Sequence, residues 1–142
     1  MGYRIVSSLV GALLTQMLLV APFAIAFSAG NLAKLDVIKS CPYCDLTDAH
    51  LAEADLSDTN LAGANLNGAI LSRASLVNAD LKDATLVEAN LENANLAGAN
   101  LANADLFKAN LAGATFEKAD LSGTVWTDGK RCKKGSMGKC SQ

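Results

Sequence analysis

The chain has 142 residues and a formal net charge of -2 at pH 7, a length that suits one domain. Only 5% of the residues are aromatic, whereas 51% are hydrophobic. This composition argues against a core built around Phe and Trp, so Ala and Leu must fill the interior.

Residues 1–26 are predicted to be a cleavable secretory signal peptide. Arg4 precedes an apolar run from Ile5 to Val20, and Ala24-Ile25-Ala26 fits the small-x-small rule of signal peptidase. Because Ile5 to Phe27 is also long enough to cross a bilayer, an uncleaved membrane anchor is the alternative. A signal peptide predicts a secreted or periplasmic protein, in a compartment where disulfide bonds form and persist.

Residues 27–43 are predicted to form an N-terminal cap. Leu32, Leu35 and Ile38 follow helical spacing, and Asn31 suits the N-cap position. We therefore expect a short capping helix in this segment.

The cap runs into Cys41-Pro42-Tyr43-Cys44, a CPYC sequence like the redox centre of a glutaredoxin. A thiol catalyst of that kind needs a helix N-terminus at the cysteine, because the positive end of the helix helps to lower the thiol pKa. Here the chain continues as DLTDAHLAEADL, which starts a repeat. We interpret the motif as a structural clip, with thiol redox activity through Cys41 and Cys44 as the alternative.

Residues 44–128 consist of seventeen five-residue units without an insertion. Nearly every unit has Leu at its centre and Ala two residues earlier, and the residue between them is usually Asp or Asn. Five residues turn an α-helix through about 500°, so the leucines of a helix would form no apolar face. An extended chain that turns a corner every five residues would instead bury each Leu and Ala, as in a solenoid.

The sequences LAGANLNGAI and LENANLAGANLANADLFKANLAGATF are similar to the pentapeptide repeat family. This resemblance implies an all-β fold, a right-handed quadrilateral β-helix with four units to a coil and the central Leu or Phe side chains stacked inside. Seventeen units would make slightly more than four coils, a rod about 20 Å tall at an inter-strand spacing of about 4.8 Å. The CDL junction and the DGKRC and GSMGKC sequences resemble exported bacterial members, those of cyanobacteria especially.

Residues 129–142 are predicted to be a basic C-terminal cap. They hold five basic residues and no acidic one, whereas residues 44–128 hold 13 acidic and 4 basic residues, a net charge of -9. Each open end of a solenoid exposes unpaired backbone and apolar side chains, so we expect caps at both ends. An uncapped end would favour an end-to-end homodimer.

The four cysteines allow three disulfide pairings. Cys41 and Cys44 lie at one end of the predicted rod, and Cys132 and Cys140 lie beyond the other, about 20 Å away. Bridged α-carbons lie within about 7 Å of each other. Local pairing of Cys41 with Cys44 and of Cys132 with Cys140 is therefore predicted, and crossed pairing would require the tail to double back.

No catalytic, cofactor or metal site is predicted, so we do not expect an enzyme. His50 is the only histidine and has no partner residues typical of a triad or a metal site. Five glycines two residues after a central position mark corners rather than a phosphate loop. Stacking at four units per coil places Val87 and Phe107 on adjacent rungs, partly exposed, as a candidate contact face.

The sequence favours an exported, non-enzymatic scaffold or interaction module with an unknown protein partner. The first alternative is mimicry of nucleic acid, because some pentapeptide repeat proteins resemble duplex DNA and protect DNA gyrase from quinolones. A signal sequence would separate this chain from such a cytoplasmic enzyme. The second alternative is thiol redox activity. We expect no direct nucleic-acid binding, membrane contact only if residues 1–26 stay uncleaved, and a periplasmic location, or the thylakoid lumen in a photosynthetic source.

Overall fold

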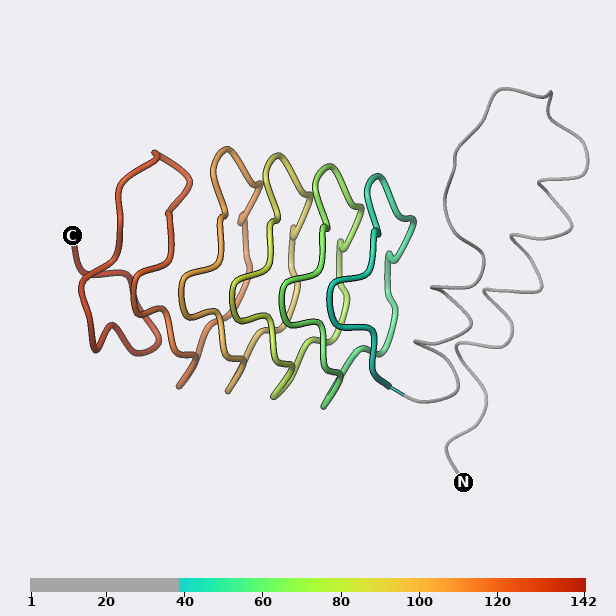
Figure 1. Cartoon of the computed structure of the whole chain (residues 1–142), viewed down its shortest axis with the longest axis horizontal. Helices are drawn as coiled ribbons and strands as arrows, with labels where there is room; N and C mark the ends of the chain where they lie inside the picture. Colours follow the sequence, from blue (N-terminus) through green and yellow to red (C-terminus); the bar gives the residue numbers. More distant parts are fainter. Residues whose placement is uncertain (1–38) are drawn as a thin grey trace, which may run out of the picture.

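The computed structural model of the chain describes residues 39–142. The predicted signal peptide and the predicted capping helix at residues 31–38 lie outside the described residues. The described chain winds into a rod of stacked coils (Figure 1). It holds no helix and no continuous strand, since single-residue parallel bridges join the coils. Among residues 39–142 no helix has the length and hydropathy needed to cross a membrane.

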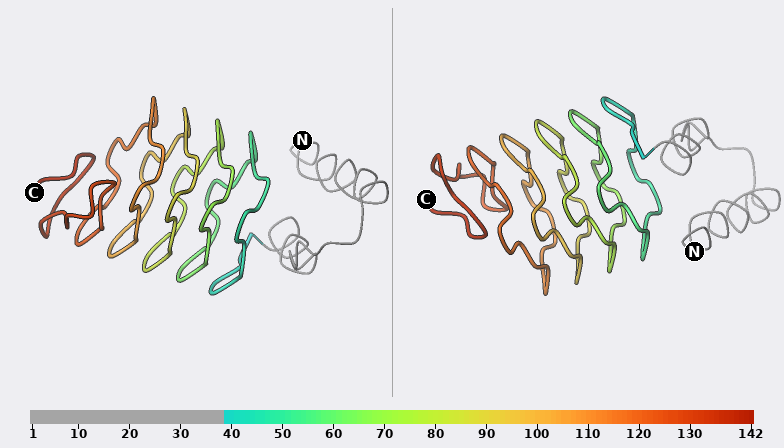
Figure 2. Two further views of the ribbon diagram at one scale, coloured as in Figure 1. Left: turned by 90° about the horizontal axis from the view of Figure 1, so that it is seen from above. Right: turned by 90° about the horizontal axis from the view of Figure 1, so that it is seen from below.

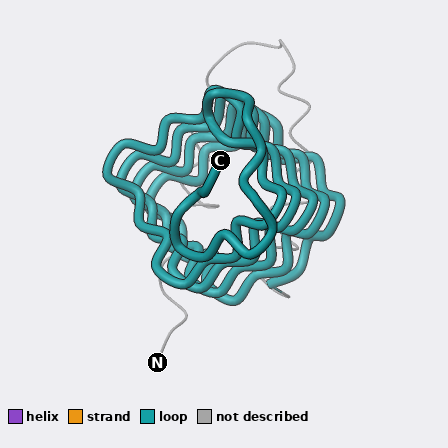
Figure 3. The backbone as a smooth tube through the Cα atoms, turned by 90° about the vertical axis from the view of Figure 1, so that its left-hand side faces the viewer, coloured by secondary structure: helices purple, strands orange, loops and turns teal. Residues whose placement is uncertain are grey.

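The bridges set the geometry of the coil, because each joins two residues that are twenty apart. From Ser40↔Asn60 to Asp105↔Val125, every fifth residue pairs with the residue one coil above. Four pentapeptides therefore complete one coil, which confirms the predicted quadrilateral β-helix. The four-cornered outline is visible along the axis in Figure 3.

The first coil begins before Cys44, the first residue of the predicted repeat. Ser40 bridges Asn60, and the Cys41 N–H donates to the Asn60 carbonyl at 2.8 Å. Residues 40–43 therefore extend the repeat, whereas the sequence pattern assigned them to a separate cap. The reason is that backbone pairing defines the coil, and Cys41 fills a central position that Leu holds elsewhere.

Leucine and alanine fill the interior of the rod. The central residues Leu66 and Leu86 are fully buried, as is Ala64, two residues before Leu66. Burying one leucine stabilises the fold by about 2 kcal/mol relative to leaving it exposed. Thr124 replaces an inward Ala, and its hydroxyl donates to the Leu101 carbonyl at 2.7 Å. The core is therefore largely apolar and periodic.

Each corner from Cys41 to Leu121 is a β-turn whose third residue has a positive φ. At the first corner after Cys44, the Ala49 N–H donates to the Leu46 carbonyl at 3.1 Å, and Asp48 has φ 55°. This combination is the signature of a type II turn, which favours Gly or Asn at the third position. Arg73 and Lys108 nevertheless adopt φ values of 59° and 58°. The corner conformation therefore does not require glycine.

The Asp or Asn before each central residue completes the turn. The Phe107 N–H donates to Asp105 Oδ1 at 2.9 Å, and the Ala102 N–H donates to Asn100 Oδ1 at 3.1 Å. The other four N–H groups of the unit that contains Asn100 find backbone acceptors. A side-chain oxygen is therefore needed for the fifth, which explains why the repeat prefers Asp and Asn there.

The tail folds back across the C-terminal end of the rod (Figures 2 and 3). Two antiparallel bridges join it to the last units, Asp120↔Met137 and Val125↔Arg131. The Trp126 ring packs inside this end, with its centroid 5.5 Å from that of Phe116. The tail therefore caps residues 119–126, which make up about half of the last coil.

Candidate functional site

The predicted contact pair, Val87 and Phe107, lies on one long face of the rod. The two residues are twenty apart and so occupy equivalent positions of adjacent coils. Val87 is half-buried, and Phe107 is 37% exposed. Below them, Asn67 Oδ1 accepts a hydrogen bond from the Val87 N–H at 2.9 Å. The structure thus places the two residues on neighbouring coils, with both side chains partly exposed.

A cation and a carboxylate flank the Phe107 ring. Lys108 Nζ lies 5.3 Å from the ring centroid and 3.3 Å from Glu88 Oε1. Gly129 of the tail lies beside the ring, where an added Cβ would meet Phe107 Cε2 at 3.4 Å, an ordinary van der Waals contact. A cation over an exposed aromatic face contributes about 0.5–1 kcal/mol, so the ring is held in place while one side stays accessible. Such a surface can bind an apolar or cationic group of a partner.

A second exposed aromatic residue, Tyr43, was not identified from the sequence as a surface feature. Its side chain is 83% exposed, and its ring lies directly against Gly63, one coil above. A side chain at position 63 would occupy the space of the ring. The glycine twenty residues after Tyr43 was therefore a signal in the sequence that could have revealed this packing.

Each cysteine lies beside its near neighbour in sequence. The α-carbons of Cys41 and Cys44 are 5.4 Å apart, and those of Cys132 and Cys140 are 5.0 Å apart, with both pairs in disulfide geometry. Cys41 is 1% exposed and Cys44 is 7% exposed, and both face the core. A redox thiol must be reached by its substrate, so this burial argues against catalysis by the CPYC motif.

His50 lies on the surface of the rod. It is exposed and bridges Ile70 through its backbone. Across residues 39–142, no group of three His, Cys, Asp or Glu side chains is arranged to hold a metal ion. His50 therefore belongs to no metal-binding cluster within this part of the chain.

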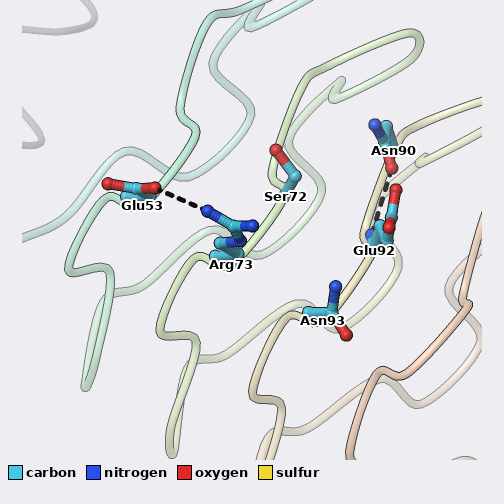
Figure 4. Close-up of a pocket in the computed structure, with 6 residues that line it drawn as sticks. All are labelled: Glu53, Ser72, Arg73, Asn90, Glu92 and Asn93. Atoms are coloured by element: carbon cyan, nitrogen blue, oxygen red, sulfur yellow. Dashed lines mark hydrogen bonds and ion pairs between the residues drawn. The ribbon is translucent and has the colours of Figure 1, made fainter.

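A shallow polar pocket lies on another face of the rod (Figure 4). Arg73 Nη1 lies 3.3 Å from Glu53 Oε1, and the two side chains are 71% and 68% exposed. Asn90 Oδ1 accepts a hydrogen bond from the Glu92 N–H at 3.1 Å. Water competes strongly for such exposed groups, so the pocket lacks the desolvation that a catalytic acid or a tight ligand site requires.

Hydrogen bonds within the turns stabilise the ionised form of several surface aspartates. The hydroxyl and then the N–H of Ser57 lower the pKa of Asp55, and Lys39 adds a smaller contribution. The same two groups of Ser122 lower the pKa of Asp120. A catalytic acid needs a raised pKa, so these carboxylates serve as structural acceptors and as fixed negative charges.

Comparisons with known proteins agree with this geometry. The family model for Pentapeptide repeats matches residues 44–83 and 84–123, in eight copies. The chain is similar to HetL, a pentapeptide repeat protein involved in heterocyst differentiation regulation in the cyanobacterium Nostoc sp. strain PCC 7120. The identity is 40% and the TM-score is 0.64, over 65% of this chain and 42% of HetL.

A second similar structure is that of alr5209, a pentapeptide repeat protein from Nostoc PCC 7120. It is 36% identical with a TM-score of 0.57, and the match covers 77% of each chain. No curated protein sequence matches the chain.

Proposed function

Since this chain belongs to the pentapeptide repeat family, we propose that it is a non-enzymatic interaction module that binds a protein through the face of Val87 and Phe107. Because side chains fill the core, a partner protein can contact only the outward-facing side chains of the rod. Phe107, an exposed ring between two coils with Lys108 beside it, is the observation that carries this proposal. Its relative HetL is involved in the regulation of heterocyst differentiation, which supports a regulatory rather than a catalytic role.

The test compares two exposed aromatic residues that lie on different parts of the rod. Phe107→Ala should abolish capture of the partner from the native cells and leave the unfolding temperature unchanged. Tyr43→Ala removes a ring that is more exposed but lies at the other end, so it should capture the same partner as the unmodified chain. Equal capture by the Phe107→Ala chain would remove the proposal.

We further propose that the protein is exported and acts in the periplasm, or in the thylakoid lumen of a photosynthetic source. The predicted signal peptide at residues 1–26 and the two cysteine pairs in disulfide geometry support this location. Cell fractionation and N-terminal sequencing of the mature chain test it. We expect a periplasmic chain that begins near Phe27, and a full-length chain in the membrane fraction would identify an uncleaved anchor.

Mimicry of nucleic acid is the second candidate, because residues 44–128 carry a net charge of -9. Part of this charge is paired on the surface, as in Arg73–Glu53 and Lys108–Glu88. A duplex mimic needs continuous lines of unpaired negative charge. Recovery of the mature chain from the cytoplasm, bound to an enzyme that acts on DNA, would favour this candidate over the first.

A further inference from the structure

The uncapped half of the C-terminal end is a second interaction surface, separate from the Phe107 face. We define the C-terminal edge as residues 109–116, the part of the last coil that the tail leaves open. We propose that this edge binds an extended acidic segment of a partner protein, which adds to it as one further run of coil.

The backbone of the C-terminal edge lacks partners that its counterpart one coil below possesses. In that lower coil, three N–H groups donate at 2.8 Å to carbonyls of the coil above, those of Leu91, Asn93 and Leu96. The equivalent N–H groups find no acceptor among residues 39–142; they belong to Leu111, Gly113 and Phe116. Two carbonyls of the edge likewise lack the donor that their counterparts have, those of Ala109 and Ala114. The edge therefore offers a periodic set of donors and acceptors to an added strand.

The backbone pairing between the tail and the last coil ends at Gly138. The Gly138 N–H donates to the Ala119 carbonyl at 2.8 Å, and Gly138 lies against the backbone between Phe116 and Lys118. From there the tail continues to Cys140 rather than along the edge, because its bond to Cys132 holds it over the other half. The part of this end that the tail leaves uncovered therefore extends from Phe116 back to Ala109.

Apolar side chains of the core are partly uncovered at the edge. Leu91 and Leu96 in the lower coil are fully buried, whereas Leu111 and Phe116 above them are half-buried. Both pack on the core, together with Ala114. A strand that continued the repeat would cover them with apolar residues of its own at five-residue spacing, and burial of that area would favour binding.

The charge of the side chains near the edge determines which kind of partner binds there most favourably. The tail carries five basic residues and no acidic one, and Lys134 and Lys139 are exposed. Glu117 follows the edge directly and Lys118 comes next, and both are exposed, so these two residues add no net charge beside the edge. Two copies that met through this end would bring their basic tails together, which costs binding energy, whereas an acidic segment is attracted. Charge therefore favours an acidic partner over a second copy.

A segment of this chain can serve as the test peptide, because it has the sequence pattern of a run of coil that would continue the edge. Residues 49–58, AHLAEADLSD, lie in the first coil on the same two faces as residues 109–118. They place Leu51 and Leu56 five residues apart and carry three acidic residues and no basic one. A synthetic peptide of this sequence with blocked ends is the test ligand. The control peptide has Lys in place of its three acidic residues.

Binding is measured by NMR and by hydrogen exchange on the full chain, with the disulfides intact. We expect the amides of Leu111, Gly113 and Phe116 to exchange fast in the free protein and to become protected by the acidic peptide. The amides of Leu91 and Leu96 should be protected with or without peptide. The basic control peptide should bind at least about tenfold more weakly.

Two matched variants locate the site. The Thr115 hydroxyl donates to Asn95 at 3.0 Å, and the Thr85 hydroxyl donates to Asn65 at 3.2 Å, so Glu at either position removes a similar bond. Thr115→Glu adds a negative charge at the edge and should weaken peptide binding about tenfold. Thr85→Glu lies in the middle of the rod and should change it less than about twofold.

Four results would overturn the proposal: no peptide binding at millimolar concentration, binding without protection of the edge amides, equal binding of the basic peptide, or a dimer of the free chain that protects the same amides. The last result would assign the edge to a second copy. Loss of the Phe107 partner leaves these measurements unaffected, so the two proposals succeed or fail separately.

Discussion

The side-chain oxygen of Asn78 occupies the space in which a side chain on Gly98 would have to begin. The two residues occupy equivalent corners of adjacent coils, and Gly98 has φ 70°. Asp58, one coil below, accepts a hydrogen bond from Asn78 Nδ2 at 3.3 Å and holds the side chain in place. The same relation joins three further pairs, Gly68 with Asp48, Gly113 with Asn93 and Gly123 with Asn103. A glycine at these corners therefore makes room for the residue below, as well as tolerating a positive φ.

Gly98→Ala should destabilise the fold more than Gly135→Ala. Both glycines have positive φ, which costs an alanine about 1 kcal/mol, but a Cβ at Gly135 would meet nothing within 4 Å. The overlap with Asn78 should add about 1–3 kcal/mol to the first variant. Urea unfolding measures both, and Asn78→Gly combined with Gly98→Ala should recover most of the excess. Equal losses in the two single variants would show that only φ matters.

Asp120 should contribute stability that depends on pH. Its folded pKa is lowered by the hydroxyl and N–H of Ser122, below the value of about 3.9 expected in the unfolded chain. A lowered carboxyl pKa stabilises the fold above the unfolded value, and this contribution is lost as pH falls through the folded pKa, here below about 4.

Asp120→Asn keeps an oxygen acceptor for the Ser122 N–H, so its stability at pH 7 should stay within about 0.5 kcal/mol of the unmodified chain. Thermal melts between pH 7 and pH 2.5 should show a smaller acid loss for this variant. Asp120→Ala removes the acceptor and should cost about 1 kcal/mol at pH 7. An identical pH dependence in the Asn variant and the unmodified chain would contradict the assignment.

The Cys132–Cys140 pair should stabilise the C-terminal cap. The bond closes a loop with a sequence separation of 8, for which the chain-entropy model gives roughly 2.5 kcal/mol, against roughly 2 kcal/mol for the separation of 3 between Cys41 and Cys44. Non-reducing peptide mapping should find these two local bonds. Changing both Cys132 and Cys140 to Ser should lower the melting temperature and speed exchange of the Leu121 amide, which the tail pairs with Ser136. A peptide that joins Cys44 to Cys132 would disprove the local pairing.

Thr124 and Thr59 should respond differently to replacement by the Ala of the repeat. Both are buried, but the Thr124 hydroxyl donates to the Leu101 carbonyl at 2.7 Å, whereas the Thr59 hydroxyl lies 3.5 Å from the Ser57 carbonyl. Thr124→Ala should cost about 1 kcal/mol, and Thr59→Ala should be close to neutral. Chemical denaturation of the two variants decides this, and equal losses would mean that the Thr124 bond adds nothing.

Much of the fold could be predicted because each unit forms its own turn from residues close in sequence. An Asp or Asn such as Asn100 supplies the acceptor for the N–H two residues later, and Leu101 then starts the turn. Repetition of this unit implies a regular corner and an apolar interior whatever surrounds it. In the same register, Cys41 takes a central position and Cys44 takes the place of an inward Ala, and both are buried. The number of units in a coil came from the family resemblance, because a five-residue period alone does not define it.

The amino-acid sequence by itself determined the repeat and the buried positions, and the four units per coil that the family resemblance implies placed Val87 next to Phe107. Only the tertiary structure decided that Tyr43 packs on Gly63 and that the tail covers residues 119–126 while residues 109–116 stay open. The reason is physical: each unit forms its turn through contacts within five residues, and identical units then pair with the same partners one coil away. The tail has no repeat, and its position depends on the few backbone bonds that it makes with a coil already formed.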